Sequence, residues 1–277
     1  MTVFPYVKDD AAGPNHPFPE ELQLDPLVLY HGTSSSYESN IDTRGLLPGK
    51  SLFDVKDLVE IVKIFADMGW AGINTGSLGT LKPFSVDHDF AQVGGKPLFL
   101  AESARRAASY ASLDYAGGEI ARSVRNCFDD LWAYLDDSSV SDDHMREMQE
   151  AVAFCKRMGA APHPVPIITM EEIRARLIAL EDVRSVALQI EMAHTYGVVY
   201  AVKFNVSDLA ASKISLSMGV MCADPIPLEK IVGKTFIPND YVHDYFHSCL
   251  GDYVVERMEQ WNSLLALEKD QRHTLDG

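Results

Sequence analysis

Leu27-Val28-Leu29-Tyr30-His31-Gly32-Thr33-Ser34 is the stretch from which the fold of this chain can be worked out. Four apolar residues run directly into a histidine, a glycine and two hydroxyl side chains, which predicts a strand that opens into a polar loop. A histidine at the end of a strand is more often a structural residue than a catalytic one. The stretch therefore indicates a site only if other parts of the chain support it.

Three further blocks follow this histidine along the chain. Block 41–46 closes a short helix at its glycine, as helix stop signals do. Block 98–111 begins as an apolar strand, Leu-Phe-Leu-Ala, and continues as an alanine-rich helix. Block 220–231 reads Val-Met-Cys-Ala-Asp-Pro-Ile-Pro-Leu-Glu-Lys-Ile and leads from one candidate strand to the next.

The periodicity of the remaining chain predicts an α+β protein with a single domain over 1–277. Helical spacing is found over 53–69, and alternating spacing over 197–206 predicts a strand. Further helical spacing predicts a helical insertion over 113–195, whose last helix is 170–192. Other expected elements are an irregular leader over 1–25, a long loop over 70–96, strands over 215–222 and 230–237, and a C-terminal helix with a polar tail over 239–277.

Composition excludes some classes of protein. Of 277 residues, 24 are Lys or Arg and 40 are Asp or Glu, so the formal net charge is −16. A surface that binds nucleic-acid backbones over its whole extent needs cationic side chains, and this chain lacks the excess. No apolar run reaches the ~20 residues that cross a bilayer, and no signal peptide is recognised. Four cysteines lie far apart, which fits a reducing compartment, so we expect a cytoplasmic protein.

Several other signals are weak. The glycines between 72 and 79 form no dinucleotide-binding motif, and Gly94-Gly95-Lys96 lacks the rest of a phosphate-binding loop. His243 and His247 are four residues apart on an expected helix and could face one metal ion, but no third ligand accompanies them. We therefore expect no metal site.

The ordered set of blocks resembles the ADP-ribosyltransferase superfamily, in the branch of the diphtheria-toxin-like toxins and the poly(ADP-ribose) polymerases. The first two blocks are also similar to the tRNA 2′-phosphotransferases of the same fold. The resemblance covers separated blocks that make up less than half of the chain, and the helical insertion is not part of it. It implies a split β-sheet core and NAD as the cofactor.

The resemblance also implies roles for particular residues. His31 would bind the adenosine ribose of NAD, and the backbone of Gly32 would hold the nicotinamide carboxamide. Phe99 and Tyr110 would sandwich the nicotinamide ring. His31 and Tyr110 are thus the candidate catalytic residues, and the candidate NAD-binding residues are His31, Gly32, Thr33, Ser34, Phe99, Ala107 and Tyr110.

The chain departs from the family at three of these places. Phe99 stands where the family usually has tyrosine, and Ala107 where a serine often binds the carboxamide. The family's catalytic glutamate falls at Met218 or Gly219, neither of which carries an acid. Another acid could substitute, the candidates being Asp224, Glu191 and Glu102, or the site has none. Without this acid, polymer synthesis is not expected.

These expectations favour an NAD-dependent mono-ADP-ribosyltransferase that modifies a macromolecule, as a toxin, an effector or a conflict-system enzyme. The net charge favours a protein acceptor over nucleic acid. The insertion over 113–195 would recognise the target or bind a neutralising partner, or else only add packing. One alternative is a catalytically silent module that binds NAD or ADP-ribose. Another is an RNA 2′-phosphotransferase, which needs several arginines at the phosphate, and only Arg44, Arg105 and Arg106 are available.

Overall fold

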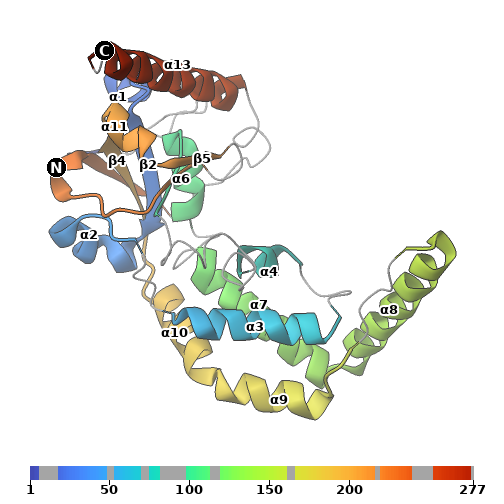
Figure 1. The fold of residues 1–277 in the computed structure, drawn as a ribbon. Helices are drawn as coiled ribbons and strands as arrows, with labels where there is room; N and C mark the ends of the chain where they lie inside the picture. The colour runs from blue at the N-terminus through green and yellow to red at the C-terminus, as the bar shows by residue number, and fades with distance from the viewer. Residues whose placement is uncertain are drawn as a thin grey trace. The chain divides into compact units, whose positions relative to one another are not determined.

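The structure is a computed structural model in which the chain folds into a mixed α+β protein (Figure 1). It describes residues 1–5, 18–48, 53–69, 75–81, 98–112, 119–160, 166–215, 219–238 and 252–275. The chain divides into two compact units. The first comprises Met1–Lys50, Gly95–Gly118 and Met192–Gly277, and the second Ser51–Gly94 and Glu119–Glu191.

Two sheets form the centre of the first unit. The larger sheet has the strand order β1-β7-β4-β2, in which β1 runs parallel to β7 and the other neighbours are antiparallel. The smaller sheet has the antiparallel order β3-β6-β5. The strands are β1 (Thr2–Phe4), β2 (Val28–Ser34), β3 (Leu98–Leu100), β4 (Gly197–Lys203), β5 (Lys213–Ser215), β6 (Gly219–Cys222) and β7 (Ile231–Ile237).

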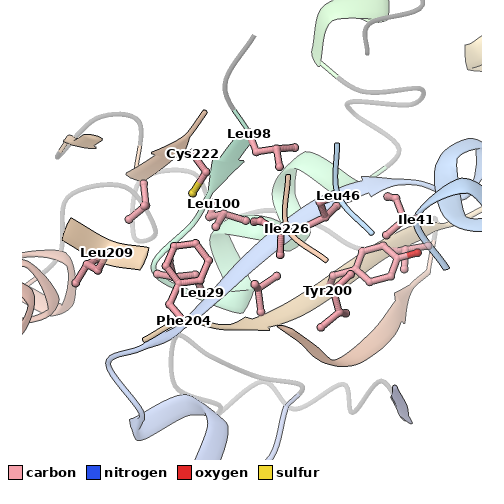
Figure 2. Close-up of a cluster of buried hydrophobic side chains, with 14 of the residues drawn as sticks. Leu29, Ile41, Leu46, Leu98, Leu100, Tyr200, Phe204, Leu209, Cys222 and Ile226 are labelled. Atoms are coloured by element: carbon pink, nitrogen blue, oxygen red, sulfur yellow. The ribbon is translucent and has the colours of Figure 1, made fainter. Parts of the chain in front are cut away.

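Side chains from both sheets share one hydrophobic cluster (Figure 2). Leu29 and Tyr200 come from the larger sheet, and Leu98, Leu100 and Cys222 come from the smaller one. Short helices join it: α2 (Glu38–Arg44), α11 (Val206–Ala210) and the one-turn helices η1 (Ser35–Tyr37) and η4 (Leu228–Lys230). The C-terminal helix α13 (Asp252–Leu275) is anchored there by Trp261, which is almost fully buried and donates from Nε1 to the Pro26 carbonyl at 2.6 Å.

Helix α6 (Ala104–Ala111) covers the other face of the larger sheet. Four alanines, Ala104, Ala107, Ala108 and Ala111, pack against Tyr30 and other apolar residues of β2 and β4. Because alanine has the smallest apolar side chain, the helix can approach the strands closely. The helix begins where Ser103 Oγ accepts a hydrogen bond from the Arg106 amide, a standard N-cap.

A buried polar cluster ties α2 to the larger sheet. The Lys234 amine of β7 lies 2.5 Å from Glu38 and also binds Asp42, both on α2. Two tyrosines of the region complete the cluster, since Tyr196 donates to Glu38 at 2.6 Å and Tyr200 to Asp42 at 3.2 Å. Burial alone would lower the pKa of Lys234, but its two carboxylate partners together raise that pKa.

From this polar cluster we expect the protein to lose stability at alkaline pH. Burial, and then the Asp42 charge, raise the pKa of Tyr200, as the carboxylates raise that of Lys234. Both groups hold their protons more tightly in the folded state. Their contribution is thus fully present below the unfolded pKa values of about 10 and is lost as the pH rises through the folded values.

Urea unfolding at pH 8 and pH 11 measures this effect. The midpoint should fall at pH 11, and the fall should be smaller in a Tyr200→Phe variant, which has no phenol to ionise at this position. Equal midpoints at the two pH values would contradict the assignment.

The second unit is helical. Its elements are α3 (Val55–Asp67), α4 (Thr75–Leu81), α7 (Glu119–Asp136), α8 (Ser138–Met158), α9 (Met170–Ala179) and α10 (Glu181–Met192). Helix α3 buries Leu58, Ile61 and Phe65 along one face, and α7 contacts α3, α4, α8 and α9. Arg176 of α9 donates to Glu60 and to Asp67 of α3, each at 2.7 Å.

Several sequence predictions agree with these elements. The helix expected over 53–69 is α3, the strand over 230–237 is β7, and the helical insertion expected over 113–195 contains α7 and α8. Of the C-terminal helix and tail expected over 239–277, residues Asp252–Leu275 form α13, and residues 239–251 lie outside the described residues. The expected strands over 197–206 and 215–222 are found as β4, which ends earlier, and as β6. Residues 216–218 lie outside the described residues.

Other predictions need correction. The segment expected to be an irregular leader over 1–25 contains two regular elements. Strand β1 is paired with β7, and Glu20–Leu24 form helix α1. The loop over 70–96 contains α4, and the helix over 170–192 is divided at Leu180. The helices of 113–195 belong to a unit that also takes in Ser51–Gly94, because the apolar face of α3 is buried among these helices. No helix among the described residues is long and apolar enough to cross a membrane.

Candidate functional site

The candidate site lies in the first unit, at the point where β2 and β3 stop pairing with each other. Tyr30 and Ala101 exchange both backbone hydrogen bonds, at 2.9 and 2.7 Å, but this bridge is isolated. Continued in the same antiparallel register, the next bonded pair would be Gly32 and Phe99. The structure has no such pair. The two strands separate one step beyond the bridge.

Gly32 therefore presents free backbone groups at this edge. Successive residues of a strand point their N–H and C=O groups to opposite edges. The N–H and C=O of Tyr30 point away from β4, toward Ala101. The N–H and C=O of Gly32, two residues later, point the same way. Ser35, three residues after Gly32, points its N–H to the opposite edge, where it donates to the Tyr196 carbonyl at 2.9 Å, as the alternation requires. Within the described chain nothing pairs with this edge of Gly32, which offers one donor and one acceptor side by side.

His31 occupies the place where the strands part. Its Nδ1 lies 3.0 Å from the Phe99 carbonyl, the oxygen that would accept from Gly32 in a continued ladder. A carbonyl only accepts, so Nδ1 carries the hydrogen. Burial lowers the pKa of His31, against a smaller raising effect of this hydrogen bond, so the ring is neutral at pH 7. In that tautomer Nε2 keeps a lone pair and can accept a hydrogen bond from a ligand hydroxyl.

Gly32 is also required by packing. A Cβ built on Gly32 would lie 1.7 Å from the backbone oxygen of Ala107 on α6. Gly197 of β4 meets the Ala111 carbonyl in the same way, at 2.0 Å. The helix thus rests on the strands at two glycines, and any larger residue would push α6 away from the sheet. Ala107 acts here as part of the helix surface that touches Gly32.

The two aromatic candidates lie on the α6 side of the split. Phe99 is two residues from Ala101, so its side chain leaves β3 on the same face as Ala101, which packs with the alanines of α6. Its side chain is 41% exposed. Tyr110 is half-buried and follows Ala107 by about one helical turn, and its side chain is hydrogen-bonded to Arg106.

Thr33 and Ser34 are placed by other contacts. Thr33 is buried and lies on the same sheet face as His31. The Ser34 hydroxyl accepts from the Ser36 amide at 3.2 Å and lies 2.8 Å from His194 Nδ1, so it caps the turn that follows β2. The contact between Ser34 and His194 joins residues 160 positions apart, and no sequence signal pointed to it.

The position of the family's acid can be examined at Gly219, the start of β6. Its backbone has φ +74°, and a Cβ there would lie 2.3 Å from the Leu100 carbonyl. A glutamate would thus meet both an unfavourable backbone conformation and a clash with β3. Met218 lies outside the described residues.

The substitute acids differ in their surroundings. Asp224 is exposed in the turn after β6. Glu191 belongs to the second unit and pairs with Arg125 at 3.3 Å. Glu102 is 1% exposed and binds Arg106 at 3.0 Å. Only Glu102 lies on the segment that joins β3 to α6, and its charge is already neutralised by Arg106.

The chain matches no protein-family model, no curated protein and no solved structure. The function is therefore argued from the site itself. Within the described ranges no group of His, Cys, Asp and Glu is arranged to hold a metal ion, and His243 and His247 lie outside those ranges.

This arrangement is suited to a flat ligand that carries a primary amide. Such an amide has one acceptor oxygen and a donor NH₂, which complement the N–H and C=O of Gly32. Phe99 leaves β3 on the side of α6, and Tyr110 belongs to α6, so each brings an aromatic ring that can stack on a planar ligand. His31 Nε2 adds an acceptor for a hydroxyl group. Residues of β2, β3 and α6 in the first unit thus carry groups that could bind an amide, a planar ring and a hydroxyl.

Proposed function

We propose that the protein is an NAD-dependent mono-ADP-ribosyltransferase that modifies a macromolecule. The observation that carries the proposal is the free edge of Gly32 at the split between β2 and β3, beside a neutral His31. Nicotinamide is a planar ring with a primary amide, and NAD joins it to a ribose with hydroxyl groups. The proposal also takes the two sheets of the first unit as an ADP-ribosyltransferase-like core.

In this proposal each residue has a binding role. The backbone of Gly32 holds the carboxamide, the rings of Phe99 and Tyr110 stack on the pyridinium, and His31 Nε2 accepts from a hydroxyl of the adenosine ribose. Thr33 and Ser34 continue the strand beside the bound dinucleotide. Ala107 fixes the distance between α6 and β2.

The reaction then breaks the bond between the nicotinamide nitrogen and ribose C1′. The electron pair of this bond leaves with neutral nicotinamide, and positive charge develops on the ribose, as in glycoside cleavage. A nucleophile of the acceptor bonds to C1′ and releases its proton to solvent. In this step the pyridinium loses its positive charge while the ribose gains one. A site that fixes both ends of NAD and twists the bond between nicotinamide and ribose lowers the barrier to this step.

The absence of an acid at Gly219 favours single transfer. Polymer synthesis requires the enzyme to activate a ribose hydroxyl of the growing chain, for which the family uses the glutamate. Gly219 cannot be replaced by such a residue without a clash. We therefore propose transfer of one ADP-ribose unit to an acceptor that supplies its own nucleophile.

The acceptor is proposed to be a protein, because a net charge of −16 disfavours nucleic acid. The second unit offers a surface for such an acceptor or for a neutralising partner. Helix α8 buries His144 and Met148, whereas Phe154 and Met158 near its C-terminus are 55% and 66% exposed. Exposed apolar side chains of this size often mark interaction surfaces.

A catalytically silent NAD-binding module is the second candidate. It is favoured by the one acid on the β3–α6 segment, Glu102, being buried in an ion pair. A 2′-phosphotransferase is less well supported, because Arg106 is already engaged by Glu102 and Tyr110 and so is not free for a phosphate.

Incubation with NAD labelled in the adenosine and separately in the nicotinamide distinguishes these functions. The proposal expects nicotinamide release together with label transfer to an added protein acceptor, and loss of both in a His31→Ala variant. Binding without release over hours would identify the silent module. Absence of both binding and release would refute the proposal.

A further inference from the structure

We propose that a groove between helix α13 and Pro26 binds a segment of a partner protein that carries arginine or lysine side chains at one end and apolar side chains at the other. The groove has a volume of about 400 Å³ and belongs to the first unit. Its walls are Pro26 and one side of α13 between Glu256 and Leu267. Binding at this groove goes beyond the proposed function and does not depend on it.

The groove runs along a single side of α13. The residues of α13 that line it are spaced i, i+3, i+4, i+7, i+8 and i+11 from Glu256, which is the spacing of one helix face. The neighbouring side of the helix carries the buried Trp261, whose Nε1 donates to the Pro26 carbonyl at 2.6 Å. This hydrogen bond holds Pro26 against α13, so the groove is formed before any ligand binds.

The end of the groove at Glu256 is acidic. Glu256 and Glu259 are exposed and lie about one helical turn apart, and within the described part of the chain neither carboxylate has an ion-pair partner. Two cations of the neighbouring segments are engaged elsewhere. Lys203 pairs with Asp25, and Arg257 is buried and donates to a backbone carbonyl of α1 at 2.7 Å. The two carboxylates are therefore available to a cation from another molecule.

Two further acceptors line the groove beside these carboxylates. The side-chain oxygen of Gln260 is buried and has no hydrogen-bond partner among the described residues. The Ser263 hydroxyl donates to the Glu259 carbonyl at 2.8 Å, so its oxygen can only accept from a ligand. An unpaired buried acceptor is costly, and the terminal torsion of glutamine is soft enough for the amide to turn toward a donor. A guanidinium supplies five donors and a positive charge, which complement this set of acceptors.

The other end of the groove is apolar. Leu264 is half-buried, and Leu267 is 60% exposed. Apolar side chains of a partner would cover this surface, and the aliphatic stem of arginine or lysine can lie along it as well. From Glu256 to Leu267 the helix rises about 17 Å, which an extended segment of about five residues spans. The partner segment should accordingly carry its charged and its apolar side chains in separate halves.

Fluorescence anisotropy with a labelled peptide and the full chain, in the absence of NAD, tests the proposal. The probe is the peptide Gly-Arg-Arg-Gly-Leu-Leu-Gly. A second peptide has citrulline, which has the shape of arginine but no charge, in place of both arginines. The wild type should bind the arginine peptide about fivefold more tightly than the citrulline peptide at low ionic strength. Equal binding of the two peptides, or no binding of either, would overturn the proposal.

Two double variants assign the binding to the groove. Glu256→Gln with Glu259→Gln should weaken binding of the arginine peptide about fivefold and leave that of the citrulline peptide unchanged. The matched control is Asp142→Asn with Glu150→Gln, which removes two exposed carboxylates of α8 and changes the net charge equally. This control should bind both peptides as the wild type does. Equal losses in the two double variants would show attraction by net charge alone, and that result would overturn the proposal, as would no loss in the groove variant.

Replacement of Leu267 by serine tests the apolar end. Both peptides carry the two leucines, so Leu267→Ser should weaken the binding of both by a similar factor. Unchanged binding of both peptides would overturn the proposed order of charged and apolar side chains. Since no NAD is present in these measurements, peptide binding by a protein that neither binds nor cleaves NAD would refute the proposed function and retain the groove.

Discussion

Replacing Gly32 by alanine is expected to lower the free energy of unfolding by about 3 kcal/mol or more. The added methyl group would lie 1.7 Å from the Ala107 oxygen, which belongs to the backbone and cannot rotate away as a side chain could. Either α6 or β2 must move, and α6 carries the alanine stripe that packs on the sheet. The free edge of Gly32 would move with them, so NAD binding should be lost as well.

Gly79 provides the matched control for this variant. It lies in α4 of the second unit, is exposed, and would meet no atom within 4 Å if it gained a Cβ. Alanine is a better helix former than glycine by up to about 1 kcal/mol, so Gly79→Ala should be neutral or stabilising. Urea unfolding of both variants measures the difference. Similar stabilities for Gly32→Ala and the wild type would contradict the close packing of α6 on β2.

Replacing His31 by alanine is expected to weaken NAD binding by about 100-fold. The change removes the acceptor Nε2, and it also removes the donor that occupies the Phe99 carbonyl. Without the imidazole between the two strands, Gly32 and Phe99 could pair and continue the ladder from Tyr30, which would close the split. Loss of the Nε2 acceptor and closing of the split thus both weaken NAD binding in this variant.

Asparagine and glutamine separate the two effects. In His31→Asn the amide NH₂ can replace the Nδ1 donor and keep Phe99 bound, but the acceptor for the ribose hydroxyl is lost. In His31→Gln the longer side chain can replace Nε2 but not the Nδ1 donor. Calorimetry should give each variant an NAD affinity between those of the wild type and His31→Ala. An affinity of His31→Ala equal to that of the wild type would remove His31 from the site.

The sequence was sufficient for the strands and helices with long, regular patterns. The apolar run before His31 predicts β2, and the spacing of 53–69 predicts α3. Shorter elements were missed although local signals existed. Asn205 and Asp208 form a capping box that starts α11 and ends the strand expected over 197–206. Strand β1 gave no such signal, because a three-residue strand depends on its distant partner β7.

Within the candidate site, sequence reasoning could name positions but not their packing. It led to His31, Gly32, Phe99 and Tyr110 through the resemblance, and these roles remain predictions. It could not foresee that Gly32 touches the Ala107 carbonyl, because that contact depends on the distance between α6 and the sheet. The pair of Glu102 and Arg106 could have been noticed, since opposite charges four residues apart at the start of an expected helix are a recognised signal.

The central claim is that the free backbone edge of Gly32 holds the amide of nicotinamide, and the glycine amide itself reports on it. The protein is labelled with ¹⁵N-glycine and with histidine carrying ¹³C at the carbonyl, so that Gly32, the one glycine that directly follows a histidine, is identified by its coupling to the His31 carbonyl. An NAD analogue whose glycosidic bond cannot break is then titrated to saturation. The account predicts that the Gly32 amide signal moves downfield while that of Gly79 stays in place. Saturable binding with an unmoved Gly32 signal would contradict it.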